Sequence, residues 1–184
     1  KTVVVTGGTS GIGLMIAGGF VAAGAEVVVA SRKADACEAA VAALSPHGTI
    51  SAIPADLSTE DGCRALARAV AADHERVHVL VNNAGATWGA PLDEHDTASW
   101  NRVLDLNVQG VFHTTKFLLP QLRAASTTDD PARVINIGST DGLHVPILET
   151  YSYSSSKAAV HQPTQSLACE WAPSGIRVNS VCPR

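Results

Sequence analysis

The sequence has 184 residues, 46% of them hydrophobic and 16% charged, which is typical of one globular domain with a substantial core. The net charge of −4 and the lack of a basic cluster argue against nucleic acid as a partner. No apolar run is long enough to span a membrane, so we expect no membrane partner and a soluble, cytoplasmic protein.

The chain begins with a predicted βαβ unit that contains a glycine-rich turn. The β-branched run 2–6 predicts a strand, and an apolar period through about residue 23 predicts a helix, with a second strand at 26–30. Between the first two lies Gly7-Gly-Thr-Ser-Gly-Ile-Gly13, where backbone N–H groups can approach a pyrophosphate at a helix N-terminus. Such a turn alone could merely connect two elements, but the complete unit favours nucleotide binding.

The residues after the second strand indicate which dinucleotide would bind. NAD-binding proteins usually place an acid here for the ribose 2′-hydroxyl, whereas this chain has Ser31-Arg32-Lys33. Arg32 can hold a 2′-phosphate through forked, charge-assisted hydrogen bonds, so we predict NADP(H) as the cofactor. The alternative is a solvated basic turn.

Strands and helices alternate through the rest of the chain. We expect strands over 50–53, 77–81, 133–137 and 177–181, with helices over 34–44, 59–72 and 97–125 and a further helix that carries Tyr153. Six strands separated by helices predict the α/β class: one Rossmann-type domain over residues 1–184, a doubly wound parallel sheet in the order 3-2-1-4-5-6. Ligands of such sheets bind outside the carboxyl ends of the strands.

The stretch Tyr151–Ala159 opens that last helix. Residues four apart share a helix face, so Tyr153 and Lys157 present a phenol and an ammonium to the same volume. The cation favours the phenolate, which would let Tyr153 exchange a proton with a carbonyl or alcohol oxygen. By itself, the pair also fits an ordinary solvated helix face.

Taken in order, these motifs resemble the short-chain dehydrogenase/reductase family. The resemblance rests on the turn Thr6–Gly13, on Asn82-Asn-Ala-Gly85, and on Asn107, Ser139 and Tyr153-x-x-x-Lys157, and it spans the whole chain. Stretches at 54–58, 131–139 and 151–153 look especially like the subgroup that contains the rhamnolipid-pathway β-ketoacyl reductase.

The resemblance implies four catalytic residues and a cofactor-binding set. Tyr153 would be the general acid or base, and Lys157 would lower its pKa and bond the nicotinamide ribose. Ser139 would orient the substrate oxygen. Asn107 would hold a local helix distortion and a water through which Lys157 exchanges protons. Besides Arg32, Tyr153 and Lys157, the cofactor-binding residues would be Gly7, Ser10, Gly11, Ile12, Gly13, Asp56, Leu57, Asn83, Ala84 and Gly85.

The implied function is NADP(H)-dependent reduction of a small-molecule ketone, with a 3-oxoacyl thioester as one candidate substrate. No metal is expected, because the four scattered cysteines form no C-x-x-C pair. The family often forms homo-oligomers through the helix of Tyr153, in which Pro163 predicts a kink. After Arg184 the family continues into a loop, a lid and a strand, so we expect the C-terminal part of its fold to be missing. The alternative function is a non-catalytic, nucleotide-binding relative that acts as a sensor or interaction module.

Overall fold

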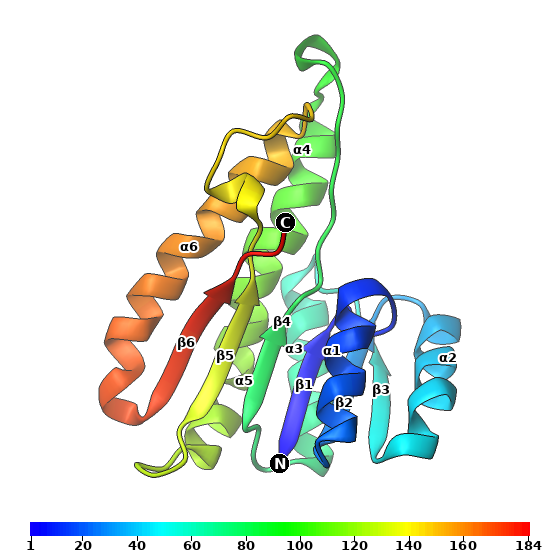
Figure 1. Cartoon of the computed structure of the whole chain (residues 1–184), viewed down its shortest axis with the longest axis vertical. Coiled ribbons are helices and arrows are strands. Elements are labelled where there is room, and N and C mark those ends of the chain that lie inside the picture. The colour runs from blue at the N-terminus through cyan, green and yellow to red at the C-terminus, as the bar shows by residue number, and fades with distance from the viewer.

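A six-stranded parallel sheet forms the centre of the computed structural model, which describes all 184 residues (Figure 1). The strands are β1 (Thr2–Thr6), β2 (Glu26–Ser31), β3 (Ile50–Pro54), β4 (Val79–Asn82), β5 (Ala132–Ile137) and β6 (Ile176–Val181). Their order is β3-β2-β1-β4-β5-β6, and every neighbouring pair is parallel. The predicted Rossmann-type sheet is confirmed, and its strand order reverses between β1 and β4, which is where such sheets bind ligands.

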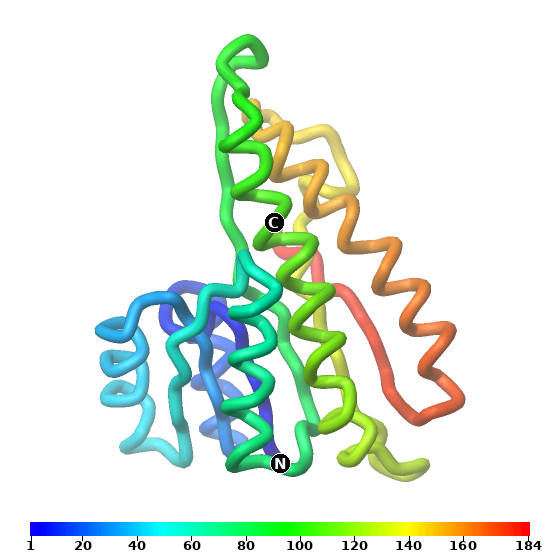
Figure 2. The backbone as a smooth tube through the Cα atoms, turned by 180° about the vertical axis from the view of Figure 1, so that it is seen from behind, coloured from blue at the N-terminus to red at the C-terminus, as the bar shows by residue number.

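Helices cover the sheet from both sides. They are α1 (Gly11–Ala22), α2 (Ala34–Leu44), α3 (Glu60–Asp73), α4 (Thr97–Leu104), α5 (Val111–Ala125) and α6 (Tyr151–Trp171). The first two lie in front of the sheet in Figure 1, and the view from behind shows α3, α4, α5 and α6 on the other side (Figure 2).

The apolar side chains of β1 divide between two cores. In β1, Val4 belongs to a core of 18 buried residues that includes Leu66 of α3 and Leu118 of α5. Its neighbours Val3 and Val5 point to the opposite face, into a core of nine buried residues shared with α1 and α2. Because both faces are covered, the strand reads as a continuous apolar run rather than as an alternating one.

The helical region predicted over 97–125 is present, but it is not one regular α-helix. A π-helical segment, Asp105–Gly110, separates α4 from α5 and contains the buried Asn107. Gly110 lies so close to the backbone after β3 that an added Cβ would stand 2.4 Å from the carbonyl oxygen of Leu57. The distortion that the family resemblance implied at Asn107 is therefore present, although the periodicity of the sequence does not reveal it.

α6 does not end at Pro163, where the sequence predicts a kink. The helix is continuous from Tyr151 to Trp171, so the proline is accommodated within it. Pro120 lies inside α5 in the same way. Neither proline ends its helix, and the kink at Pro163 stays a prediction.

Two segments rise beyond the carboxyl ends of the strands and frame the space above the sheet. One leads from β4 to a tip at the 3₁₀ turn Leu92–Glu94, and the other leads from β5 to α6 (Figure 1). The Ala90 N–H donates a hydrogen bond of 3.1 Å to the Glu149 carbonyl oxygen, which ties the two segments together.

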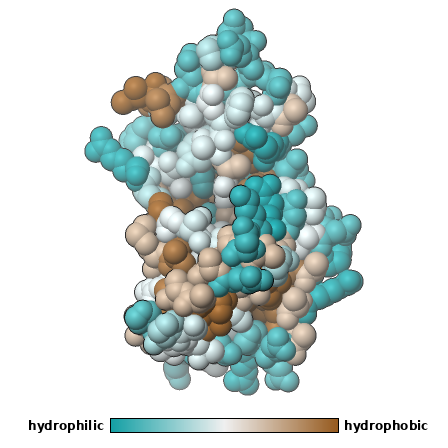
Figure 3. Space-filling view, turned by 90° about the vertical axis from the view of Figure 1, so that its right-hand side faces the viewer, coloured by the Kyte–Doolittle hydropathy of each residue, from teal (hydrophilic) through white to brown (hydrophobic).

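The surface is mixed in polarity. In the hydropathy-coloured view, hydrophilic and neutral groups predominate and the hydrophobic groups form separate patches (Figure 3). None of the helices combines the length and the apolar character needed to cross a bilayer.

Candidate active site

The glycine turn between β1 and α1 packs backbone against backbone. Gly7 and Gly11 have φ values of 63° and 52°, in the left-handed region that side chains disfavour. A Cβ on Gly13 would stand 2.2 Å from the Gly7 carbonyl oxygen and 2.4 Å from Asn83 Nδ2. Ser10 precedes α1 in an extended conformation and makes no side-chain capping bond. The first N–H groups of α1 thus begin beside a turn that only glycine can form.

Hydrogen bonds fix this turn to the end of β4. Asn83 Nδ2 donates to the carbonyl oxygens of Thr6 and Gly7, at 2.9 and 3.2 Å. In the other direction, the Thr6 hydroxyl oxygen accepts from the backbone N–H groups of Asn83 and Ala84, both at 3.0 Å. We predicted no role for Thr6 from the sequence, yet its hydroxyl aligns the glycine turn with the segment that begins at Asn83. The feature that could have revealed this role is a polar Thr at the last position of a strand whose centre is apolar.

A cavity of about 360 Å³ opens over the glycine turn. It reaches from the turn across the ends of β2 and β4 to the residue after β3, and the predicted residues that line it are Gly7, Ser10, Ile12, Gly13, Arg32, Leu57, Asn83, Ala84 and Gly85. Gly11 and Asp56 are not among its lining residues. Its floor is backbone that packs too closely to accept side chains, because a Cβ at Gly7 would stand 2.9 Å from Ala84 Cα and a Cβ at Gly13 would meet the Gly7 carbonyl oxygen. Such a glycine turn lets a pyrophosphate approach the backbone.

Asp56 lies beside this cavity, with its carboxylate held by its own loop. Oδ1 accepts hydrogen bonds from the Ser58 hydroxyl at 2.7 Å and from the Ser58 N–H at 3.1 Å. These bonds, with a smaller contribution from the Arg32 charge, hold the pKa of Asp56 below its usual value. Asp56 therefore shapes the loop after β3 and stays ionised near Arg32.

A second cavity, of about 450 Å³, adjoins the first and shares Ile12, Asn83 and Gly85 with it. Ser139, Tyr153 and Lys157 line this second cavity, so the structure brings together three of the four predicted catalytic residues. Lys157 Nζ lies 5.6 Å from the centre of the Tyr153 ring. The phenol, the ammonium and the serine hydroxyl thus share one cavity, next to the space for a dinucleotide.

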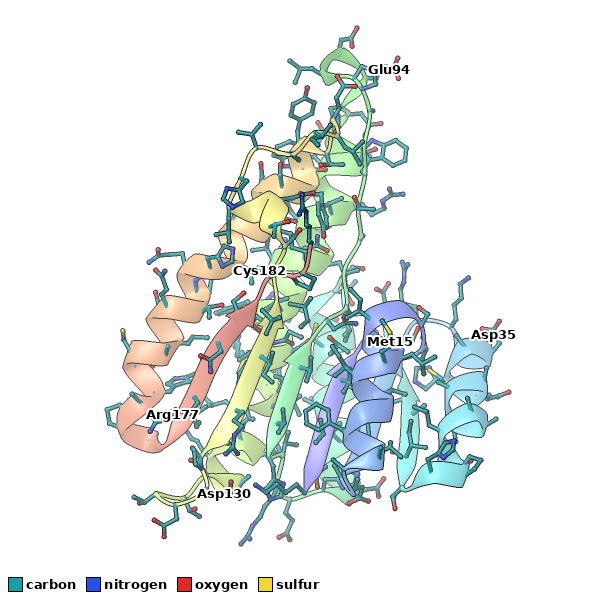
Figure 4. All side chains as sticks on the ribbon, in the orientation of Figure 1. Met15, Asp35, Glu94, Asp130, Arg177 and Cys182 are labelled. Carbon is teal, nitrogen blue, oxygen red and sulfur yellow. The ribbon has the colours of Figure 1, made fainter.

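Lys157 is buried despite its charge, with 6% of its surface exposed. Its Nζ donates a 2.7 Å hydrogen bond to the Ile137 carbonyl oxygen at the end of β5. Burial lowers the pKa of Lys157 to about 8, and the neighbouring Cys182 partly opposes that shift. Figure 4 shows Cys182 near the carboxyl ends of the strands, far from Asp130 and Arg177 at the opposite end. At pH 7 the amine is mostly protonated.

Hydrogen bonds within the protein hold the side chains of Ser139 and Asn107. The Ser139 hydroxyl oxygen accepts a 3.1 Å bond from the Asp141 N–H, which leaves its own hydrogen free for a ligand. Asn107 does not line the cavity and makes no hydrogen bond to Lys157. Its side chain instead bonds Ala86 and Ser156, a residue that the sequence did not single out.

Comparisons with known proteins agree with this geometry. A sequence model described as short chain dehydrogenase matches residues 1–184. The chain belongs to the short-chain dehydrogenase family. It is 45% identical over 183 residues to the rhamnolipids biosynthesis 3-oxoacyl-[acyl-carrier-protein] reductase of Pseudomonas aeruginosa, covering 100% of this chain and 72% of that relative. It is 33% identical to the D-beta-hydroxybutyrate dehydrogenase of Cupriavidus necator, covering 100% of this chain and 69% of that one.

Solved structures of short-chain dehydrogenases superimpose closely on this chain. The Pseudomonas aeruginosa RhlG/NADP active-site complex matches with a TM-score of 0.97 and 45% identity, covering 100% of this chain and 72% of that one. NAD+-bound xylitol dehydrogenase matches with a TM-score of 0.91 and 29% identity, covering 100% and 69%. The predicted subgroup is therefore confirmed together with the family.

Proposed function

We propose that this short-chain dehydrogenase reduces a ketone to a secondary alcohol with NADPH, and that 3-oxoacyl thioesters are its substrate class. The observation that carries this proposal is the meeting of Ser139, Tyr153 and Lys157 in one cavity that shares a wall with the glycine-turn cavity. The 45% identity to a 3-oxoacyl-[acyl-carrier-protein] reductase over the whole chain supports the substrate class.

The preference for NADPH follows from Arg32, the residue directly after β2. Arg32 lines the glycine-turn cavity, and Ser31, rather than an acid, precedes it. A guanidinium binds a 2′-phosphate with charge-assisted bonds, whereas NADH would leave it unpaired. The NADP complex of a relative with 45% identity supports the same choice.

The chain's own residues supply orientation and a proton. The Ser139 hydroxyl, whose hydrogen is not used within the protein, donates to the substrate carbonyl oxygen. Tyr153 gives its phenolic proton to that oxygen as negative charge develops on it, and the Lys157 ammonium stabilises the phenolate left behind. A bound dihydronicotinamide supplies the hydride to the carbonyl carbon. In the direction of alcohol oxidation, the phenolate takes the proton back.

Replacing Tyr153 with Phe tests this assignment, because the ring stays and only the transferable proton is lost. We expect Tyr153→Phe to lower kcat by roughly 10²-fold or more and to leave the Kd of NADPH within about twofold. Steady-state reduction of a panel of ketones and 3-oxoacyl thioesters, with a fluorescence titration of NADPH, measures both quantities.

Tyr151→Phe is the matched control, since this exposed tyrosine lies two residues earlier in α6 and does not line the catalytic cavity. It should retain the activity of the unsubstituted protein. Full turnover by Tyr153→Phe, or equal losses in both variants, would show that Tyr153 is not the proton donor.

A further inference from the structure

The side-chain amide of Asn107 uses both of its donor hydrogens inside the protein. Its Oδ1 accepts from the Ala86 N–H at 2.7 Å, which fixes the orientation of the amide. Nδ2 then donates to the Ala86 carbonyl oxygen and to the Ser156 hydroxyl oxygen, both at 2.9 Å. Asn107 is 1% exposed, so no solvent can replace these partners.

Ser156 continues this chain of hydrogen bonds into the catalytic helix. Its hydroxyl accepts from Asn107 and donates a 2.7 Å bond to the Tyr153 carbonyl oxygen, three residues earlier in α6. Ser156 is fully buried, at 0% exposure, and directly precedes Lys157. A single hydroxyl thus joins the π-helical segment to the turn of α6 that carries both the phenol and the ammonium.

We propose that Ser156 is a positioning residue of this active site, which holds the first turn of α6 at the rotation that directs Tyr153 and Lys157 into the substrate cavity. The inference rests on the proposed reductase function. Ser156 lines neither cavity and touches no reacting atom, so it acts through Asn107 and the Tyr153 backbone.

The consequence of losing the hydroxyl follows from the burial of its partners. Without it, an Asn107 Nδ2 hydrogen is left unpaired in a closed interior, which favours movement of the π-helical segment or of α6. Proton transfer depends on donor and acceptor being within hydrogen-bond reach, and a displacement of about 1 Å can lower a rate by about 10²-fold. A small rotation of α6 would therefore reduce turnover more than cofactor binding.

The test compares two buried serines of the same helix. Ser156→Ala removes the bridging hydroxyl, whereas Ser152→Ala removes a hydroxyl that is equally buried, at 0% exposure, but has no hydrogen-bond partner. We expect Ser156→Ala to lower kcat by about 10- to 100-fold, with the Kd of NADPH within about twofold. Ser152→Ala should match the unsubstituted protein. All rates are measured well below the melting temperature of each variant.

Ser156→Thr separates positioning from stability. It restores the hydroxyl but adds a methyl group in a filled interior, so it should be less stable than the unsubstituted protein and yet more active than Ser156→Ala. Amide hydrogen exchange over residues 151–157 should accelerate in Ser156→Ala and not in Ser152→Ala. Because exchange requires no turnover, it tests the role of Ser156 even if no ketone is reduced, a result that would overturn only the proposed function.

Any one of the following results would overturn the inference. One is a kcat for Ser156→Ala within about twofold of the unsubstituted protein. Another is an equal loss in Ser152→Ala, which would assign the effect to burial in general. A third is activity in Ser156→Thr no higher than in Ser156→Ala. A fourth is unchanged exchange over residues 151–157 in Ser156→Ala.

Discussion

Lys157 keeps a charge where burial opposes it, and we attribute that cost to the catalytic role proposed for the residue. Its single hydrogen bond goes to the Ile137 carbonyl oxygen at 2.7 Å, and no carboxylate is paired with its Nζ. The pKa therefore falls from 10.5 to about 8, mainly through desolvation. A buried ammonium close to a tyrosine is expensive for stability but useful for proton transfer.

The lowered pKa of Lys157 predicts how stability depends on pH. Between about pH 8 and 10.5 the unfolded chain binds the proton and the folded chain does not, so the folded state gains stability as pH rises through this window. Below pH 8 both states hold the proton and the full cost of about 3 kcal/mol is present.

Comparison with Lys157→Met isolates this contribution. The free energy of unfolding of the unsubstituted protein, relative to that of the variant, should rise by up to about 3 kcal/mol between pH 7 and 10.5. Urea unfolding at a series of pH values measures the difference. A difference that stays constant over this range would mean that Lys157 titrates at its ordinary pKa in the fold.

At the scale of elements, α1 shows how the position of a glycine determines its role. Gly13 lies where an added Cβ would meet the Gly7 carbonyl oxygen at 2.2 Å, whereas an added Cβ on Gly19 would meet nothing within 4 Å. The first glycine permits the close approach of helix and turn. The second is an exposed helical position in which Ala is the better helix former.

Gly13→Ala and Gly19→Ala therefore make a matched pair of variants. We expect Gly13→Ala to weaken NADPH binding at least tenfold and to lower the melting temperature, because the turn must move away from the helix. Gly19→Ala should keep the affinity and stabilise the fold by about 0.5–1 kcal/mol. Calorimetry and NADPH titration check both, and similar affinities in the two variants would contradict the role of the turn.

Elements were predicted best where burial imposes a repeating pattern. The six strands differ from the structure by at most two residues at either end. The Val-rich runs of β1 and β2, which are buried on both faces, are predicted to within one residue. The periodicity of the sequence does not reveal the π-helical segment. A π-bulge shifts the helix by only about one residue, so the apolar pattern of α4 and α5 still looks like that of one α-helix. Pro163 lies inside the continuous helix α6, and the kink predicted there stays a prediction.

The site residues were predictable to the extent that they belong to motifs. Tyr153, Lys157 and Ser139 meet in one cavity as expected, and the glycine turn meets Asn83. Thr6 and Ser156 were missed because their roles consist of hydrogen bonds between segments far apart in the sequence. The water between Asn107 and Lys157, the cofactor contacts and the homo-oligomer stay predictions.

For the molecule as a whole, the central claim is that a cofactor half and a catalytic half meet at the switch point of the sheet. Strands β1 to β3 and α1 provide the glycine turn and Arg32, while the end of β5 and α6 provide the proposed catalytic side chains. The two cavities share Ile12, Asn83 and Gly85, so a dinucleotide bound in one would extend into the other. One assay of substrate reduction with each cofactor therefore tests both halves of the site.

The most direct measurement is kcat/KM for reduction of a 3-oxoacyl thioester with NADPH and with NADH, by the unsubstituted protein and by Arg32→Asp. We expect reduction to the 3-hydroxyacyl product with at least a tenfold preference for NADPH, and a loss or reversal of that preference in Arg32→Asp, because the aspartate repels the 2′-phosphate. No reduction with either cofactor, or the same preference ratio in both proteins, would contradict the account.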